Sequence, residues 1–399
     1  MPALSPRASF WTAASVAGLA LWASAAPTIV YPLYERSWGF TAATSTLVFA
    51  MYPLVLIPVL LVFGNISDHL GRRFAILLGL GALALGTLVF GVASGLPEVL
   101  LGRALMGVGV GFSLSPAAAA MIEVGGPERA RNASSVLTAA TATGLALATI
   151  VGGALVQYAP SPLHLPFWVL LAVIVVVGVF AVLLPRGVDP LAGRWRPRAP
   201  RVPAGLRRPF VAGALAIACA YAVGSVFLAL GAQVAVELLR SANAFVDGAV
   251  ISISAVAIGV VAIVARRLAP RAALGFGPIA ILVGMGCLVV AGVDRSMPLF
   301  VAASIITGAG YSLMYAGGIG IITTSAPAHH RAAIISAAFT VGYLVQACVA
   351  LALGAIATNL GLLAAIEIGG ILLVVLAASA ALVANVRTRQ AAPADEPVS

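Results

Sequence analysis

Long apolar stretches fill most of this sequence, and they constrain the possible folds more than any other feature. Each stretch provides the roughly 20 apolar residues that an α-helix needs to cross about 30 Å of hydrocarbon. Only 9% of the 399 residues are charged, whereas a soluble domain has about 25%. So little polar surface would not cover a soluble globule, and the chain is expected to lie in a lipid bilayer.

The spans are predicted from apolar runs that end at clusters of Pro, Gly and Arg. Twelve are expected, at residues 10–33, 42–66, 74–94, 98–123, 132–158, 165–184, 210–236, 243–267, 272–293, 298–324, 332–357 and 362–385. All should be helical, because a spanning segment must satisfy its own backbone hydrogen bonds and the alternating pattern of a membrane barrel is absent. The predicted class is an all-α integral membrane protein with twelve transmembrane helices.

The first span has a second interpretation. Arg7, the apolar run after it and the Ala-Ser-Ala tripeptide at 23–25 are typical of a secretory signal with its cleavage site. The apolar character continues past this tripeptide to Tyr31, and the span has a counterpart at 210–236. Both observations favour a retained transmembrane helix.

The sequence repeats itself across its length. The segment PERAR at 127–131, before the fifth span, corresponds to PAHHR at 327–331, before the eleventh. In the same way, GVG at 107–109 corresponds to GAG at 308–310. The twelve helices are therefore expected to form two pseudo-symmetric halves of six.

Four regions follow from this repeat. The N-terminal six-helix half is expected at 1–185 and the C-terminal half at 210–386. Residues 186–209 are rich in Arg and Pro and are predicted to be a cytoplasmic linker. Residues 387–399 are predicted to be a disordered cytoplasmic tail.

The basic residues predict the orientation. All 22 are arginines, and with both termini inside, only Arg36, Arg240 and Arg295 lie outside, while Arg103 lies within the fourth span. An excess of arginine on the cytoplasmic side is the usual arrangement. The net charge of +10 is therefore interpreted as a topology signal and an attraction to anionic inner-leaflet lipid, not as a nucleic-acid-binding surface.

Residues 64–73 read GNISDHLGRR, between the second and third spans. This segment resembles the loop between helices 2 and 3 of the major facilitator superfamily of secondary transporters, whose pattern is Gly-x-Leu-Ala-Asp-Arg-x-Gly-Arg-Arg/Lys. The departure is His69, where the family usually has Arg. The resemblance implies two six-helix halves that move a small solute by alternating access.

The resemblance also implies that this loop is a conformational latch. It places Asp68 beside the inner N-terminus of the eleventh helix, after Arg331, and an arginine of the loop beside an acid of the fourth helix, here Glu123. Gly71 is expected to adopt a positive backbone angle. The predicted gating residues are Gly64, Asp68, Gly71, Arg72, Arg73, Glu123 and Arg331.

Arg103 is the charged residue that lies deepest in a span. A charge there costs about 2.5–3.5 kcal/mol on insertion scales, so it is a functional candidate. The segment LGRALMGVG at 101–109 resembles the family's span-4 signature, and the resemblance implicates the arginine in substrate or proton handling. Two interpretations stay open, an arginine that faces a central cavity and one that snorkels to the outer surface.

Several polar or aromatic residues fall at similar depth near the middle of the membrane, and mostly apolar walls with few polar groups are typical of sites for small organic molecules. The predicted pathway residues, beside Arg103, are Trp22, Tyr52, Tyr221, Ser225, Tyr311, Tyr315, Tyr343 and Gln346. The alternative is interhelical packing with hydrogen-bonded Tyr hydroxyls.

The fifth span carries a partial signature. The segment GLALATIVGG at 144–153 keeps three glycines of the motif found in drug-exporting members, but it has Ala-Thr in place of the central Gly-Pro. Gly144, Gly152, Gly153 and Gly107 are equally consistent with close helix packing. The antiport assignment therefore stays open.

Proton coupling requires a titratable acid, and no Asp or Glu lies at the centre of a span. Glu123, Glu237, Asp247 and Glu367 lie near span ends and are the candidates. An uncoupled facilitator is the alternative. Motifs for metal binding, nucleophilic catalysis or nucleotide binding are absent from the sequence, so no cofactor, no metal and no enzymatic activity are expected.

The predicted function is proton-coupled efflux of a small organic compound across the inner membrane of a bacterium. The alternatives are a proton-linked or uncoupled importer of a sugar or an organic acid, and a membrane sensor on the same fold. The expected partners are the substrate, protons and anionic lipid, and the expected oligomeric state is a monomer.

Overall fold

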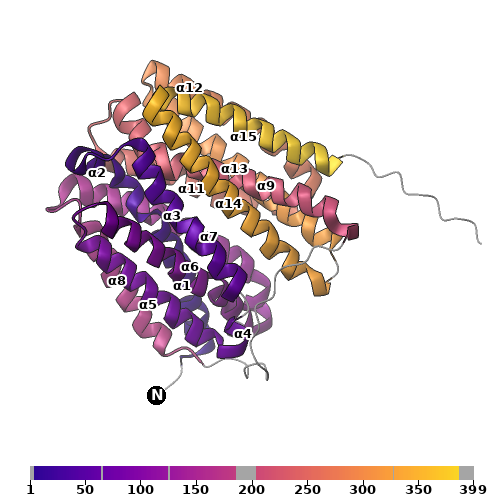
Figure 1. The fold of residues 1–399 in the computed structure, drawn as a ribbon. Helices are drawn as coiled ribbons and strands as arrows, with labels where there is room; N and C mark the ends of the chain where they lie inside the picture. Colours follow the sequence, from indigo (N-terminus) through magenta and orange to yellow (C-terminus); the bar gives the residue numbers. More distant parts are fainter. Residues whose placement is uncertain (1–3, 64–65, 125, 186–203, 327, 386–399) are drawn as a thin grey trace, which may run out of the picture.

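The computed structural model describes residues 4–63, 66–124, 126–185, 204–326 and 328–385. Within these residues, twelve helices are long and apolar enough to cross a membrane. They occupy the twelve predicted positions, so the all-α class and the number of spans are confirmed (Figure 1).

Two sets of helices build the halves. The first contains α1 (Pro6–Ala25), η1 (Ala26–Ile29), α2 (Tyr31–Trp38), α3 (Ala42–Phe63), α4 (Ile66–Leu70), α5 (Arg72–Gly91), α6 (Leu96–Val124), α7 (Gly126–Tyr158) and α8 (Leu165–Val182). The second contains η2 (Ala204–Leu206), α9 (Arg207–Ser225), η3 (Val226–Leu230), α10 (Gly231–Gln233), η4 (Val234–Leu238), α11 (Ala244–Val264), η5 (Ala265–Arg267), α12 (Pro270–Asp294), α13 (Met297–Ser325), α14 (Ala328–Leu360) and α15 (Leu362–Asn385).

The first span differs from its prediction at its end. The α-helix gives way to a 3₁₀ turn at Ala26–Ile29, which contains Pro27, and the chain continues as α2. Proline lacks the N–H that an α-helix needs, which explains the change. The helix α2 then ends at Gly39, whose φ of 68° is typical of a glycine that terminates a helix.

The seventh span is not a single α-helix. After Ser225 the backbone forms two π-helical stretches, Val226–Leu230 and Val234–Leu238, with α10 between them. The span also starts earlier than predicted, because α9 begins at Arg207 and η2 precedes it. The end of the predicted linker is therefore helical, whereas residues 186–203 and the predicted tail at 387–399 lie outside the described residues.

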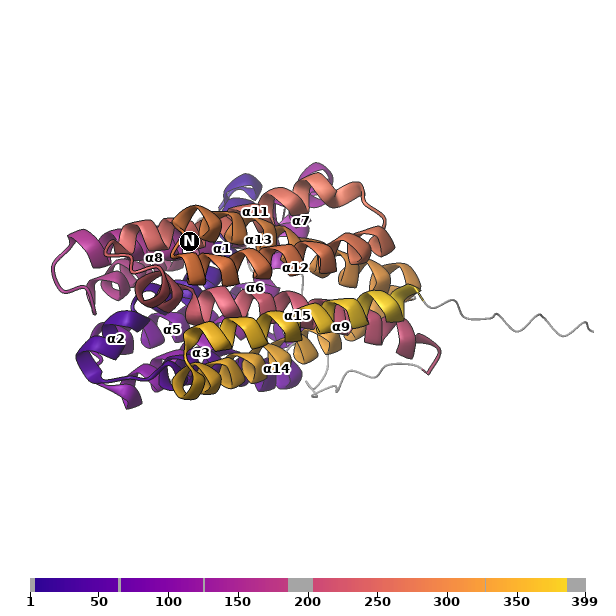
Figure 2. The ribbon, with the colours of Figure 1, turned by 90° about the horizontal axis from the view of Figure 1, so that it is seen from above.

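The two halves lie side by side. Figure 1 shows the indigo-to-magenta half next to the pink-to-yellow half, and Figure 2 shows the long helices of both running in nearly the same direction. The contacts between halves are made mainly by α3 against α14 and by α7 against α11. One hydrophobic cluster includes residues of both halves.

Two hydrogen bonds identify one end of the helix bundle. The N–H of Leu4 donates to the carbonyl of Leu183 at 3.0 Å, and Arg208 Nε donates to the carbonyl of Val383 at 3.4 Å. The starts of α1 and α9 therefore lie beside the ends of α8 and α15. We call this end the terminal face and the opposite end, which carries α2, the far face.

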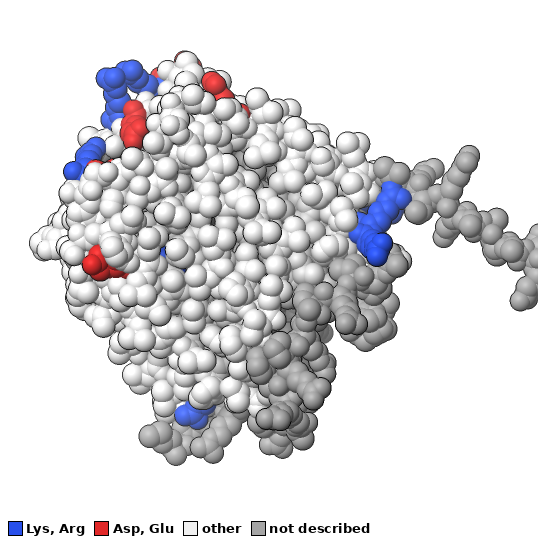
Figure 3. Space-filling view, in the orientation of Figure 1, with Lys and Arg blue, Asp and Glu red and all other residues white. Residues whose placement is uncertain are grey.

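The charged residues lie toward the ends of the bundle. In Figure 3 the blue and red side chains gather near the edges of the view, and the surface between them is almost entirely uncharged. An uncharged band between charged ends is the surface that a lipid bilayer would surround.

Candidate functional site

An aromatic cluster occupies the middle of the second half. It consists of Tyr221 on α9, Tyr311 and Tyr315 on α13, and Phe339 and Tyr343 on α14. The ring of Tyr221 lies at the centre, with its centroid 4.7 Å from that of Tyr343 and 6.1–6.5 Å from those of the other three. Four of the predicted pathway residues are therefore brought together.

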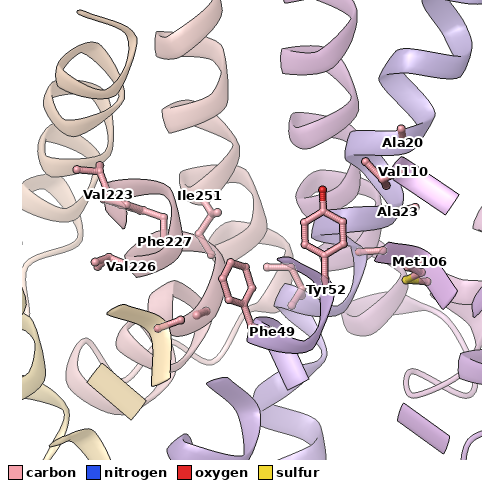
Figure 4. Packing of buried hydrophobic residues seen from close by; sticks show 14 of the residues in the cluster. Ala20, Ala23, Phe49, Tyr52, Met106, Val110, Val223, Val226, Phe227 and Ile251 are labelled. Atoms are coloured by element: carbon pink, nitrogen blue, oxygen red, sulfur yellow. The ribbon is translucent and has the colours of Figure 1, made fainter. Parts of the chain in front are cut away.

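Tyr52 connects this cluster to the first half. The hydroxyl of Tyr343 lies close enough to the hydroxyls of Tyr221 and Tyr52 to interact with both as a hydrogen-bonding group. In Figure 4 Phe49 and Tyr52 of α3 lie between first-half residues such as Met106 and second-half residues such as Phe227. The phenol groups thus meet at the junction of the two halves.

The other predicted pathway residues have different surroundings. The Ser225 hydroxyl donates to the carbonyl of Ala222 at 2.7 Å, on its own helix. Trp22 is half-buried against the hydrophobic core. Gln346 is only 8% exposed, and its Oε1 has no hydrogen-bond partner among the described residues.

Arg103 is completely buried, at 0% exposure. Its guanidinium donates to three backbone carbonyls, those of Ser24 at 2.8 Å, Val48 at 3.2 Å and Phe49 at 3.3 Å. The interpretation that Arg103 snorkels to the outer surface is therefore wrong, because none of the side chain reaches solvent or lipid. The guanidinium instead links α1, α3 and α6.

The backbone explains why two of these carbonyls accept from Arg103. Ser24 lies in the last turn of α1, where carbonyls lack an intrahelical donor. Phe49 lies four residues before Pro53, which is inside α3 and has no N–H to give. Arg103 also stacks over aromatic faces, with its guanidinium carbon 5.2 Å from the ring centre of Tyr52 and 5.8 Å from that of Phe49.

On the terminal face, Arg72 contacts Glu123. Arg72 Nε donates to Glu123 Oε1 at 3.0 Å, with both side chains about one quarter exposed, and Arg72 Nη1 donates to Ser67 Oγ at 2.6 Å. Arg73 Nη1 donates to the carbonyl of Leu184 at 3.3 Å. Gly71 has a φ of 87°, a backbone conformation that side chains other than glycine rarely adopt.

The other residues predicted to form the latch are Gly64, Asp68 and Arg331. Gly64 and the side chains of Asp68 and Arg331 lie outside the part of the chain that the structure describes. The role predicted for them as a conformational latch stays a prediction.

The predicted packing glycines differ in their surroundings. An added Cβ at Gly107 would lie 2.7 Å from the carbonyl oxygen of Tyr52, and one at Gly144 would overlap the carbonyl oxygen of Gly18. At Gly153 an added Cβ would lie 2.5 Å from the carbonyl oxygen of Ala244. Gly152 has more room, since its nearest contact is Ile29 Cβ at 4.0 Å.

The far face carries an acid that the sequence interpretation did not consider. The carboxylate of Glu35, on α2, accepts a hydrogen bond from Ser45 Oγ at 2.9 Å and another from Gln233 Nε2 on α10. Glu35 lies just beyond the predicted first span at 10–33 and is not among the acids predicted for proton coupling. The signal that could have found it is the amphipathic pattern of Tyr31–Trp38, which places Glu35 among aromatic residues.

Burial changes the ionisation of Glu35. Loss of hydration raises the pKa of its carboxyl to about 7, and the charge of Glu237 acts in the same direction. The hydrogen bonds from Ser45 and Gln233 and the charge of Arg36 oppose this rise. The carboxyl of Glu35 therefore changes its charge near neutral pH.

Further hydrogen bonds join the two halves at the far face. Beside the Gln233–Glu35 bond, they are Thr28 Oγ1 to the Leu228 carbonyl at 2.9 Å, the Ala43 N–H to Thr358 Oγ1 at 2.9 Å and the Ala244 N–H to Gln157 Oε1 at 2.8 Å. The helices also approach closely here, because a Cβ added at Gly248 would overlap the carbonyl oxygen of Thr149. The far face of this structure is closed.

The described residues contain no group of three or more His, Cys, Asp or Glu that could hold a metal ion. The groups present at the junction are phenol hydroxyls, a buried guanidinium, an amide and aromatic faces. Mostly apolar walls with few polar groups are typical of sites for small organic molecules.

Comparison with known proteins identifies related sequences. A family model described as Major Facilitator Superfamily matches residues 10–350. The puromycin resistance protein pur8 of Streptomyces alboniger is 31% identical over 132 residues, which are 33% of this chain and 26% of that protein. The multidrug efflux pump LfrA of Mycolicibacterium smegmatis (strain ATCC 700084 / mc(2)155) is 31% identical over 172 residues, which are 42% of this chain and 33% of that protein. The chain thus matches about a quarter to a third of the length of these relatives.

Solved structures share the fold over nearly the whole chain. A bacterial homolog of the human lysosomal transporter Spinster, in an inward-facing and unoccupied conformation, has a TM-score of 0.74 at 15% identity, with 95% of this chain and 97% of that chain covered. The nucleoside transporter NupG has a TM-score of 0.75 at 13% identity, with 94% and 98% covered. The peptide transporter POT in complex with sulfate has a TM-score of 0.75 at 16% identity, with 94% and 93% covered.

Proposed function

Because the chain belongs to the major facilitator superfamily, we propose that it exports a small organic compound from a bacterial cell in exchange for protons. Family membership makes it a multi-pass secondary transporter and not an enzyme. What we propose beyond family membership is the class of substrate, the direction of transport and the coupling of transport to protons.

The observation that carries the proposal is the junction of phenol groups between the halves. Alternating access needs a site that both halves contact, because the substrate must be released by one arrangement of the halves and bound by the other. Tyr52 comes from the first half, and Tyr221 and Tyr343 come from the second. Their rings offer flat apolar surfaces, while the unpartnered Oε1 of Gln346 offers an acceptor.

Export is supported by the two relatives. Both are described as resistance or efflux proteins, and the segment at 144–153 keeps part of the glycine pattern of drug exporters. Aromatic rings with few polar groups also suit an amphipathic organic compound better than a sugar, which needs many hydrogen-bonding groups. The substrate class that we propose is therefore an apolar or aromatic organic molecule.

We infer that the terminal face is cytoplasmic. The arginine excess on that side supports this orientation. The closed far face would then face the cell exterior, and the structure would represent a state closed to the outside. We expect the transporter to work as a monomer, since one chain supplies both halves.

Export can be tested with purified protein in liposomes, with puromycin as the first probe. An imposed proton gradient should drive puromycin movement, and a protonophore should abolish it. Tyr221→Ala should reduce the rate at least tenfold, whereas Phe276→Ala should leave it unchanged, because the Phe276 ring on α12 is 57% exposed.

The substrate itself can be found by comparing the solutes of expressing and non-expressing cells without choosing a target. Depletion of an organic solute from expressing cells would support export. Accumulation of a solute in expressing cells would contradict export and indicate an importer.

A further inference from the structure

We propose that Glu35 binds a proton from the far-face medium and that this protonation stabilises the closed far face. This inference rests on the proposed proton coupling and names the residue whose protonation would favour closure of the far face. It is based on the position of one carboxyl group between the two halves.

The position of Glu35 links its charge to the contact between halves. Glu35 and Ser45 belong to the first half, on α2 and α3, and Gln233 belongs to the second half, on α10. Ser45 is 0% exposed and Gln233 is 1% exposed, whereas Glu35 is only partly buried. A proton from the far-face medium can therefore reach a carboxyl that the closed halves hold.

The surroundings of Glu35 provide little compensation for a negative charge. The segments η1, α3 and α10, which pack on α2, contain no charged residue. Arg36 on α2 and Glu237 on η4 carry opposite charges and act on the carboxyl in opposite directions. The hydroxyls of Tyr31 and Tyr34, also on α2, are buried and have no hydrogen-bond partner among the described residues.

Gln233 can serve both charge states of the carboxyl. Its Nε2 donates to Glu35 in this structure, while its buried Oε1 has no partner among the described residues. A rotated amide would offer that oxygen to the O–H of a protonated carboxyl, because a side-chain amide both donates and accepts. Protonation thus forms one O–H bond and removes one negative charge while the contact between halves is kept.

The sign of the pH effect follows from hydration. When the far face is open, the carboxyl is hydrated and its pKa should be near the ordinary glutamate value of about 4.3. In the closed face burial raises the pKa to about 7, so the closed face binds the proton more tightly. The ratio of closed to open molecules is therefore largest at low pH and falls as pH rises toward about 7.

The experiment measures the distance across the far face in the absence of substrate. Spin labels are placed at Ser94→Cys in the first half and Ala242→Cys in the second, in a variant without the three native cysteines. Both positions are exposed and lie in loops between helices at the far face. When the pH is lowered from 8 to 5.5, the ratio of molecules with a short label distance to those with a long one should rise more than tenfold. This follows from a Glu35 pKa of about 7 in the closed face and of about 4.3 in the open face.

Two variants isolate the carboxyl. Glu35→Gln copies the neutral state, so the short distance should dominate at every pH and the ratio should change less than twofold. Glu237→Gln makes the same chemical change on the same face. It should keep the pH response and move its midpoint to lower pH, because the charge of Glu237 helps to raise the pKa of Glu35.

A pH response in Glu35→Gln equal to that of the wild-type protein would overturn the proposal, as would a wild-type distance that does not change with pH. The proposed export function fails by a different result. If the protein does not export the solute but its far face still responds to pH, the proposed export is wrong and the role of Glu35 stands. If the protein exports the solute but its far face does not respond to pH, the role of Glu35 is wrong and the proposed export stands.

Discussion

The guanidinium carbon of Arg103 lies 5.2 Å from the ring centre of Tyr52, and Tyr52 meets Tyr343 of the other half. The buried guanidinium of Arg103, which holds three helices of the first half together, thus contacts a residue of the junction between the halves. A change at Arg103 should therefore affect transport through the position of Tyr52.

Arg103→Lys tests this relationship. Lysine keeps the charge but provides one compact ammonium instead of a planar fork, so it cannot reach the carbonyls of Ser24, Val48 and Phe49 together. Leaving buried carbonyls unpaired costs about 1–3 kcal/mol each. Transport should fall at least tenfold and the unfolding temperature should fall, while the amount of protein in the membrane stays the same. Unchanged transport in both the Lys and the Gln variants would remove Arg103 from the mechanism.

Tyr343→Phe tests the junction. The change removes only the hydroxyl that lies near Tyr52 and Tyr221, and one hydrogen bond is worth about 1 kcal/mol. We expect the apparent affinity for the substrate to fall about fivefold, with unfolding temperature close to that of the wild type. The matched control is Tyr158→Phe at an exposed tyrosine. Equal losses of stability and transport in Ala variants of Tyr311, Tyr315, Tyr343 and Gln346 would show that these residues only pack.

Asp68→Asn tests the predicted latch on the terminal face. A carboxylate at a helix N-terminus is worth about 0.3–2 kcal/mol, and a loss of ~1.4 kcal/mol shifts a two-state equilibrium about tenfold. Transport should slow with little change in substrate affinity, and cysteine labelling of positions that line the terminal side should increase. Glu123→Gln should have a smaller effect, because the Arg72–Glu123 pair is partly exposed. Unchanged labelling together with a collapse of affinity would mean that the loop binds substrate.

The sequence predicts the features that depend only on residues close together along the chain. Each span is apolar along its own length, and Tyr311 and Tyr315 share a helix face because they are four residues apart. The contacts of Glu35 could not be predicted, since they require the turn at Ala26–Ile29 and the register between α2 and α10. The carbonyl partners of Arg103 likewise lie on α1 and α3, although Pro53 does predict a free carbonyl at Phe49.

Gly248→Ala tests whether close packing of α7 and α11 closes the far face. An added Cβ at Gly248 would overlap the carbonyl oxygen of Thr149, and backbone cannot move aside as a flexible side chain can. The variant should favour the open far face, which the labels at residues 94 and 242 would report as a longer distance at pH 5.5. Gly286→Ala is the matched control, because nothing lies within 4 Å of its added Cβ. If Gly248→Ala keeps the short distance and the wild-type unfolding temperature, the approach of these helices is not what holds the far face closed.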